Sequence, residues 1–451
     1  MQLALLAGTQ SGCGKTTLML ALLQYLQSHQ HKLVSFKAGP DFLDPLWHQV
    51  VTGRQSYNID TRMIGTELSS QLIAEQSGHA DIALIEGVMG LFDGRSGVGG
   101  SGSSAELAQQ LQLPVFLVVD AKGMSGSIVP LVQGFVQYAE NMGVHIAGVI
   151  ANRVGSTHHA NLLRNILHEY QQPPLIAWME KNAPELPERH LGLVQPSEVQ
   201  LPDFLPFLHI EVDSLTDLFT EALGKQPKVE CDDRSEIASA IASQKSNSTS
   251  STPPKNTGQG LFNNKIIAIA KDAACCFIYP ANLNFLQQQG AELVFFSPIA
   301  GDSMAEKVDA LWLPGGYPEL FAEQLSESNS WQSIRLFIEA GKPVLAECGG
   351  AMLLGELLID HDGNQWPMAK ILPYHSIMQK KLASLGYREE ASGMHGHEFH
   401  HSTRVTKQQL ESCFRLGRGD KGIRYKNLRA SYIHWYFASA PEVITEWLGG
   451  H

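Results

Sequence analysis

Short apolar runs alternate with helix-like segments along the first half of the chain. The runs lack a regular polar alternation, which is typical of strands covered on both faces of a parallel sheet. We expect strands at residues 3–7, 32–38, 82–86, 115–120 and 144–152, and a helix at 15–29 directly after the first strand. This alternation predicts an α/β domain built on a parallel sheet.

The second half of the chain repeats this pattern. We expect strands at residues 265–270, 293–297, 310–313 and 344–347, separated by helical stretches. The pattern predicts a second α/β domain.

A change of composition separates the two halves. Residues 243–260, SQKSNSTSSTPPKNTGQG, are rich in Ser, Thr, Asn, Pro and Gly and contain no aromatic residue. Such a segment buries too little apolar surface to order itself, so we interpret it as a flexible tether. The expected organisation is an N-terminal domain at 1–225, a linker at 226–262 and a C-terminal domain at 263–451.

Composition narrows the class of protein. The 451 residues are 43% hydrophobic and 17% charged, with a net charge of −12, which argues against general binding to nucleic acid or to an anionic membrane. No apolar stretch approaches the roughly 18 residues needed to span a bilayer, and the N-terminus lacks the basic region of a signal peptide. The 6 cysteines show no disulfide-framework or CxxC spacing. We therefore expect a soluble, cytoplasmic protein with reduced thiols.

A glycine-rich loop follows the first expected strand, and it reads GTQSGCGKTT. The glycines let backbone N–H groups face phosphate oxygens, and the next helix offers its positive N-terminus. Lys15 would reach the terminal phosphates of a nucleotide, and the Thr16 hydroxyl would bind Mg²⁺. The common pattern places glycine at the position of Thr9, so this loop is longer by one residue. The expected nucleotide-binding residues are Gly8, Thr9, Gly12, Gly14, Lys15, Thr16 and Thr17.

Two acidic clusters follow later strands of the same half. GPDFLDP, residues 39–45, carries Asp41 and Asp44, and EGVMGLFDG, residues 86–94, carries Glu86 and Asp93. The carboxyl ends of parallel strands line the ligand crevice of an α/β sheet, and carboxylates suit Mg²⁺. We therefore expect Asp41 and Glu86 to join Thr16 at a magnesium site, with Asp44 and Asp93 as weaker candidates.

A cysteine stands at a sharp turn in the second half. In PVLAECGGAMLL, residues 343–354, Cys348 lies between an apolar strand and a glycine-rich helix start. This arrangement exposes a side chain beside a helix N-terminus, which favours the thiolate. We expect Cys348 to be a nucleophile.

A nucleophilic cysteine needs a base and an oxyanion hole. Gly315 and Gly316, in LPGGYPE, can turn their backbone N–H groups toward an oxyanion. His434, in the strand-like run SYIHWYF, is one candidate base. The cluster MHGHEFHH, residues 394–401, suggests a zinc site, but HEFH is one residue short of the helical HExxH zinc pattern and alternates like a strand.

Seven segments together resemble one known family. GTQSGCGKTT, GPDFLDP and EGVMGLFDG resemble the amidoligase domain of the cobyrinic acid a,c-diamide synthases, which is related to P-loop enzymes of the dethiobiotin synthetase type. PGGYPE, AECGGAM, GHEFHHS and RASYIHWYF resemble the class I glutamine amidotransferase domain of the same family. The resemblance implies an α/β protein of two domains, the first a P-loop NTPase-like parallel-sheet domain and the second a glutaminase.

The resemblance implies a carbon–nitrogen ligase of cobalamin biosynthesis. ATP would activate the a and c carboxylates of a corrinoid acid, and glutamine would supply the nitrogen. Cys348 would be the glutaminase nucleophile and His434 its base, with ATP and Mg²⁺ as cofactors. Its partners would be small molecules only, namely the corrinoid carboxylic acid, glutamine and ATP, and a homodimer is left open.

The sequence departs from related glutaminases at one position. Many class I glutaminases carry Glu two residues after the catalytic His, where this chain has Tyr436. Glu398 is a candidate for the acid that orients His434.

Other interpretations of the sequence stay open. A hydrogenobyrinate or nickel-sirohydrochlorin a,c-diamide synthase, or a cobyric acid synthase-like enzyme, would share both domain types. A ParA-like nucleotide switch with an inactive glutaminase-like module is a further alternative. Such switches carry a second lysine early in the phosphate loop, where this chain has Gln10.

Overall fold

The structure is a computed structural model that describes residues 2–78, 80–94, 102–189, 192–212 and 260–449. The chain forms two compact units, each assembled from segments that are not contiguous in sequence. The first contains Met1–Val34, Ser70–Ala183 and the described part of 204–259, and the second contains Ser35–Ser69, Pro184–Asp203 and Gly260–His451, as far as these are described. The second unit thus includes two segments of the N-terminal half. Most of the expected linker, 226–262, lies outside the described residues.

The N-terminal half carries a sheet of eight strands with the order β10-β7-β6-β5-β1-β4-β2-β3. All the strand pairs recorded for it are parallel except β10 with β7, so the predicted parallel sheet is confirmed. β1 is buried along most of its length between β4 and β5. The strands are β1 (Gln2–Gly8), β2 (Leu33–Ala38), β3 (Tyr57–Ile59), β4 (Ile82–Gly90), β5 (Val115–Asp120), β6 (Ile146–Val154), β7 (Leu175–Glu180) and β10 (Leu208–Ile210).

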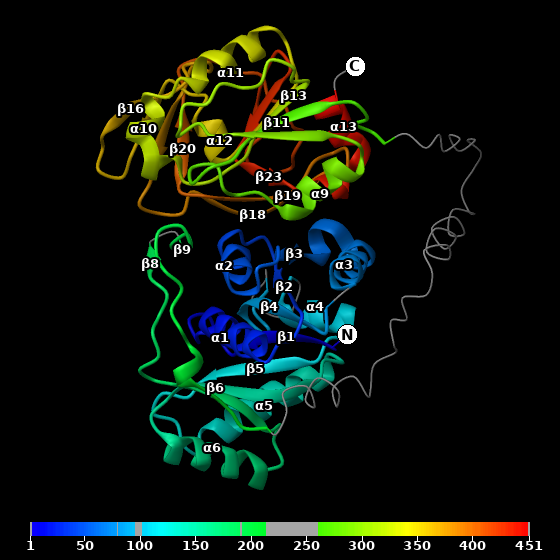
Figure 1. The fold of residues 1–451 in the computed structure, drawn as a ribbon, viewed down its shortest axis with the longest axis vertical. Coiled ribbons are helices and arrows are strands. Elements are labelled where there is room, and N and C mark those ends of the chain that lie inside the picture. The colour runs from blue at the N-terminus through cyan, green and yellow to red at the C-terminus, as the bar shows by residue number, and fades with distance from the viewer. Residues whose placement is uncertain (1, 79, 95–101, 190–191, 213–259, 450–451) are drawn as a thin grey trace, which may run out of the picture. The chain divides into compact units, whose positions relative to one another are not determined.

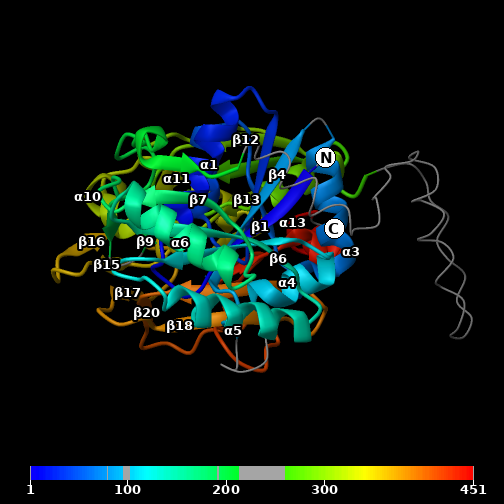
Figure 2. The ribbon, with the colours of Figure 1, turned by 90° about the horizontal axis from the view of Figure 1, so that it is seen from below.

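Helices connect these strands, as expected for parallel pairing. α5 and α6 pack side by side (Figures 1 and 2). Ser103 caps α4 and Ser156 caps α6 by accepting a hydrogen bond from a backbone N–H of the first turn, as N-cap serines commonly do. The helices are α1 (Lys15–Ser28), α2 (Leu43–Thr52), α3 (Thr61–Ser77), α4 (Ser104–Leu111), α5 (Ile128–Asn141), α6 (Thr157–Glu169) and the 3₁₀ turn η1 (Leu205–Phe207).

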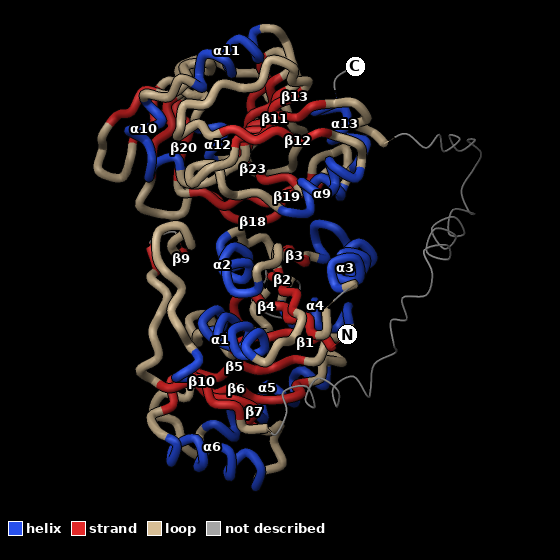
Figure 3. The backbone as a smooth tube through the Cα atoms, viewed as in Figure 1, coloured by secondary structure: helices blue, strands red, loops and turns tan. Residues whose placement is uncertain are grey.

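The C-terminal part of the second unit is built on a sheet of six strands, ordered β12-β11-β13-β14-β22-β21. The pairs are parallel apart from β21 with β22. Figure 3 shows α13 and α9 beside these strands. The strands are β11 (Ile266–Ala270), β12 (Glu292–Phe296), β13 (Ala310–Leu313), β14 (Val344–Glu347), β21 (Ile423–Tyr425) and β22 (Leu428–Ser431).

Smaller elements complete the second unit. A four-stranded sheet has the order β16-β15-β17-β20, a three-stranded sheet the order β18-β19-β23, and β8 pairs with β9. The strands are β8 (Glu188–Arg189), β9 (Gly192–Leu193), β15 (Leu357–Ile359), β16 (Gln365–Pro367), β17 (His375–Met378), β18 (Ser384–Glu389), β19 (His395–His400), β20 (Ser402–Val405) and β23 (Ile433–Trp435). The helices are α9 (Pro280–Gln288), η2 (Pro318–Phe321), α10 (Ala322–Ser326), α11 (Ser330–Glu339), α12 (Gly349–Met352), η3 (Phe437–Ser439) and α13 (Pro441–Gly449).

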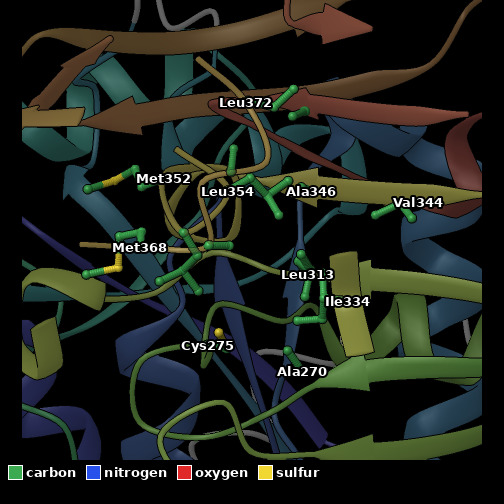
Figure 4. Close-up of a cluster of buried hydrophobic side chains, with 14 of the residues drawn as sticks. Ala270, Cys275, Leu313, Ile334, Val344, Ala346, Met352, Leu354, Met368 and Leu372 are labelled. Carbon is green, nitrogen blue, oxygen red and sulfur yellow. The ribbon is translucent and has the colours of Figure 1, made fainter. Parts of the chain in front are cut away.

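The central strands of the six-stranded sheet are buried on both faces. In β11, Ala268 and Ala270 belong to one hydrophobic cluster, whereas Ile267 and Ile269 belong to another. β13 and β14 divide their side chains in the same way, because neighbouring residues of a strand point to opposite faces. Figure 4 shows the first cluster, to which strands, loops and helix α11 contribute. This double burial explains why the strands read as continuous apolar runs.

The predicted fold class, two α/β domains, is confirmed. One element differs from its prediction, because the strand-like run at 431–437 is not one strand. It breaks at Tyr432, with β22 in the six-stranded sheet before it and β23 in the three-stranded sheet after it. The break carries His434 out of the main sheet and places it beside β19.

Candidate active sites

The phosphate loop joins β1 to α1. Gly12 and Gly14 have φ angles of 75° and 90°, in the left-handed region that favours glycine. Gly14 is the N-cap of α1, and no side chain caps this helix end. Backbone N–H groups at such a helix start are suited to an anion. Cys13, between these two glycines, is fully buried.

The end of β6 supports this loop, a role that was not predicted from the sequence. Asn152 donates a hydrogen bond from Nδ2 to the carbonyl of Cys13 at 2.9 Å. Arg153 donates to the carbonyl of Gly12 at 3.2 Å and forms an ion pair of 2.7 Å with Asp120. A Cβ on Gly14 would lie 2.0 Å from Nδ2 of Asn152, so the loop also needs glycine there for space. The sign of this role in the sequence is the polar pair Asn152 and Arg153, which lies near the end of the apolar strand β6.

Two of the three expected magnesium ligands lie together in the first unit. Thr16 donates a hydrogen bond of 2.6 Å to Glu86 from the first turn of α1. Glu86 is fully buried in β4, next to β1. A hydroxyl and a buried carboxylate are oxygen donors of the kind that Mg²⁺ accepts, so these residues fit the ion. The weaker candidate Asp93 accepts a hydrogen bond from the Gly90 N–H at 2.8 Å.

The other acidic cluster belongs to the second compact unit. Asp41 accepts hydrogen bonds from the N–H groups of Leu43 and Asp44 at 2.8 and 3.1 Å, and thereby caps the start of α2. Asp44 is buried and forms an ion pair of 2.5 Å with the equally buried Lys37. Both carboxylates therefore have a local role in the structure of this segment.

Cys348 stands at a strained turn between β14 and α12. Its φ and ψ angles are 45° and −110°, an unfavourable region for a residue with a side chain. The N–H of Cys348 donates to the carbonyl of Ser431 at 2.7 Å, which ties the turn to β22. Strain held in place by surrounding structure is typical of functional turns.

The state of the thiol differs from the expectation. Burial, with a smaller contribution from Glu319, raises the pKa of Cys348 well above its ordinary value. The helix start therefore does not make it a thiolate at rest, and the expectation of a thiolate is corrected. A base is needed to remove the proton.

Gly315 brings the cysteine and the histidine together. A Cβ built on Gly315 would lie 2.3 Å from Cε1 of His434 and 3.1 Å from Cβ of Cys348. Cys348 and His434 therefore flank the same glycine. The N–H of the neighbouring Gly316 lies 3.0 Å from the place of a Cβ on Gly349, at the start of α12. The two expected oxyanion-hole glycines thus lie against the cysteine turn.

His434 lies in β23 opposite His397 of β19. It is buried, and burial together with His397 lowers its pKa well below the ordinary value, so its ring is neutral. Within the described residues, Nδ1 of His434 has no hydrogen-bond partner. The buried hydroxyl of Tyr436, at the position of the missing Glu, also lacks one there.

Glu398, the candidate for the orienting acid, has other partners. It forms an ion pair of 2.5 Å with Arg388 and contacts His400 at 2.9 Å. Although desolvation opposes it, these partners lower the pKa of Glu398 to about 2. The carboxylate is therefore ionised and engaged within its own sheet.

The remaining histidines do not form a metal site in the described residues, where no cluster of three His, Cys, Asp or Glu side chains suits an ion. GHEFHH lies in and just after the strand β19, which agrees with its alternating pattern. His397 contacts the hydroxyl of Tyr279 at 2.8 Å through Nδ1. Burial and, next, Arg388 lower the pKa of His397 to about 3, so it is neutral.

Replacing Gly315 with alanine is expected to damage the cysteine–histidine pair selectively. The new methyl group would overlap the His434 ring, so the ring must move away from Cys348. We expect the glutamine hydrolysis that the resemblance implies to fall by about 10²-fold or more, in line with the loss of a positioned base. Glutamate release measures this effect.

The control is Gly417→Ala, at an exposed glycine of the same half where an added Cβ meets open space. Unchanged hydrolysis in Gly315→Ala would contradict the geometry.

Comparison with known proteins identifies both halves. Residues 4–194 match the CobQ/CobB/MinD/ParA nucleotide binding domain, and residues 266–442 match the CobB/CobQ-like glutamine amidotransferase domain. Cobyrinate a,c-diamide synthase of Herminiimonas arsenicoxydans is 38% identical over 448 residues, covering 98% of this chain and 95% of the relative. The same enzyme of Priestia megaterium is 34% identical, with 98% and 95% coverage. Hydrogenobyrinate a,c-diamide synthase of Stutzerimonas stutzeri is 37% identical, with 97% and 96% coverage.

Proposed function

The chain belongs to the cobyrinate a,c-diamide synthase family, and we propose that it amidates the a and c carboxylates of cobyrinate with ATP and glutamine. It is a ligase with a nucleotide-binding domain and a glutamine amidotransferase domain. The observation that carries the proposal is the similarity over nearly the full length, which spans both centres. This similarity to synthases also favours an enzyme over a nucleotide switch.

The glutaminase half would release ammonia. We propose that Cys348 transfers its proton to the neutral His434 and attacks the side-chain amide carbon of glutamine. The backbone N–H groups of Gly315 and Gly316 would stabilise the oxyanion that forms. Protonated His434 would then donate to the departing ammonia, leaving a thioester that water hydrolyses to glutamate.

The ligase half would make the substrate carboxylate reactive. A carboxylate is a poor electrophile until one oxygen carries a phosphoryl group, which ammonia can then displace as phosphate. The loop from Gly8 to Thr17 would hold the ATP phosphates, with Lys15 on the terminal phosphates. Thr16 and Glu86 would hold Mg²⁺, and Asp41 remains a proposed further ligand. When bound, Mg²⁺ neutralises charge on the transferred phosphoryl group.

We propose that residues 1–225 form the ligase domain and 263–451 the glutaminase domain, joined by a linker at 226–262. The matches at 4–194 and 266–442 fall inside these limits. Among the described residues, no helix has the length and apolar character needed to cross a bilayer.

The related substrates differ in the tetrapyrrole ring and in the metal that it carries. Relatives named for cobyrinate and for hydrogenobyrinate have similar identities to this chain, at 38% and 37%. Incubating the full chain with ATP, glutamine and each of cobyrinate, hydrogenobyrinate and nickel-sirohydrochlorin tests the choice. We expect cobyrinate to gain two amides, as read from product masses. Amidation beyond two groups, or of the nickel compound alone, would contradict the proposal.

A further inference from the structure

Three aromatic or imidazole rings pack around His434. The ring of His397 stacks on it, with a centroid distance of 5.0 Å and an angle of 17°. Phe42 lies 4.9 Å from it at 50°, and Phe277 lies 6.0 Å away. His397 and Phe277 come from the C-terminal half, but Phe42 comes from the N-terminal half, in the segment Ser35–Ser69 of the second compact unit.

Phe42 is held by an aromatic cluster. Its ring stacks on Phe277 at 4.9 Å and 6°, and lies 4.6 Å from Tyr279 and 5.6 Å from His397. Aromatic pairs at these separations stabilise one another beyond the effect of the area they bury. Phe42 therefore contacts both His434 and the residues that surround it.

The backbone on either side of Phe42 is also fixed. Asp41 caps α2 on one side, and Asn58 donates from Nδ2 to the carbonyls of Gly39 and Asp41 at 2.8 and 2.6 Å. These bonds hold the turn that presents the Phe42 ring.

The rest of the segment is attached to the C-terminal half at three further points. Asp60 accepts a hydrogen bond of 2.7 Å from the hydroxyl of Tyr387. His395 contacts the carbonyl of Met63 at 2.8 Å. The hydroxyl of Tyr57 accepts from Asn284 at 2.8 Å. The position of Phe42 is thus set by hydrogen bonds as well as by ring packing.

A base that has no orienting acid needs another means of holding its ring. In cysteine and serine hydrolases a third group commonly fixes the histidine through the second ring nitrogen. Here Nδ1 of His434 has no partner within the described residues, and Glu398 is engaged by Arg388 and His400. The contacts recorded for the His434 ring are instead with other rings, namely the stacked His397 and the tilted Phe42 and Phe277.

We propose that Phe42 is a positioning residue of the glutaminase, and that its ring holds His434 in the orientation that accepts the Cys348 proton. This inference rests on the proposed function, because it assumes that Cys348 and His434 hydrolyse glutamine. It makes the glutaminase centre dependent on a side chain that lies outside residues 263–451.

The test compares three substitutions of Phe42 in the full chain. The readout is the rate of glutamine-dependent amidation divided by the rate of ammonia-dependent amidation, together with kcat and KM for glutamine hydrolysis. We expect Phe42→Ala to lower the ratio about tenfold through kcat, with KM for glutamine changed by less than about twofold, because a misplaced base slows chemistry without removing substrate contacts. Phe42→Leu is expected to be intermediate, and Phe42→Tyr, which keeps the ring, to restore most of the ratio.

Phe399→Ala is the matched control. Phe399 lies on β19 two residues after His397, but its side chain is 39% exposed and its ring contacts His401. We expect this variant to keep the wild-type ratio. If Phe42→Ala is not recovered as a folded protein, the difference between Phe42→Leu and Phe42→Tyr still tests the inference.

Several outcomes would overturn the inference. They are an unchanged ratio in Phe42→Ala, a rise in KM alone, or a Tyr variant no better than the Leu variant. Cys348→Ser and His434→Ala separate this failure from failure of the proposed function. If both of those variants still hydrolyse glutamine, the proposed function is wrong, whereas if both are inactive and Phe42→Ala is not impaired, only the role of Phe42 is wrong.

Discussion

Cys348→Ser is expected to abolish glutamine-dependent amidation and to preserve amidation supported by free ammonia. A serine hydroxyl is a far weaker nucleophile than a thiolate, and the neutral His434 is suited to a thiol rather than to an alcohol. We expect glutamine-dependent turnover to fall by at least about 10³-fold, because removal of a nucleophile leaves only binding and oxyanion stabilisation. Product masses with glutamine and with an ammonium salt, measured in parallel, show the two activities separately.

The ammonium arm is the internal control for folding and for the ligase centre. Cys413→Ser gives a second comparison, because Cys413 is a half-buried free thiol of the same half with no assigned chemistry. Loss of both nitrogen sources in a folded Cys348→Ser protein would count against two separate centres. Retention of glutamine use would remove Cys348 as the nucleophile.

Lys15→Ala is expected to remove amidation with either nitrogen source. Phosphorylation of the carboxylate precedes the attack of ammonia, so both routes depend on the charge that Lys15 places on the terminal phosphates. Loss of one such stabilising group commonly costs about 10²–10³-fold in kcat. Phosphate release and amide formation, each with glutamine and with ammonium, measure the effect.

Lys32→Ala is the matched control for this change, because Lys32 is an exposed lysine of the same half, next to the start of β2. It is expected to behave like the unaltered protein. Hydrolysis of glutamine should persist in Lys15→Ala, since the Cys348 centre is separate. Turnover with ammonium in Lys15→Ala would exclude the assigned role.

The elements that can be predicted from the sequence are those that depend on local pattern. β14 has its predicted limits because three consecutive apolar or small residues, closed by Glu347, end at a glycine turn. The phosphate loop is recognisable because Gly12 and Gly14 act through the local backbone and Lys15 follows them directly in the sequence. For the same reason the sequence alone predicts that Cys348 stands at a turn.

The parts that cannot be predicted depend on contacts between distant segments. Asn152 reaches Cys13 across 139 positions of sequence, and nothing near Asn152 indicates that partner. β22 ends at Ser431, and after Tyr432 the chain enters another sheet, although the residues around the break form one strand-like run. The raised pKa of Cys348 follows from burial and, to a smaller extent, from Glu319, which no local pattern reveals.

The segment GPDFLDP, residues 39–45, contains both a feature that local pattern predicts and one that depends on a distant contact. Its acidic residues suggest a metal site from their place after a strand, and this remains a proposal for Asp41. The phenylalanine between them carries no such signal, because an isolated aromatic residue beside a helix start is most often part of a core. Its contact with His434 arises from the packing of the segment Ser35–Ser69 with the C-terminal half, which no local pattern indicates.

The assignment of Ser35–Ser69 to the second unit bears on how such enzymes are recombined. A chimera that joins residues 263–451 to a foreign synthetase would bring Cys348 and His434 but leave Phe42 behind, together with the hydrogen bonds of Asp60 and Tyr57. The graft would expose the aromatic faces of Phe277 and Tyr279. An exchange that keeps this packing must transfer residues Ser35–Ser69 together with residues 263–451. The glutaminase centre therefore cannot be exchanged as one continuous stretch of sequence.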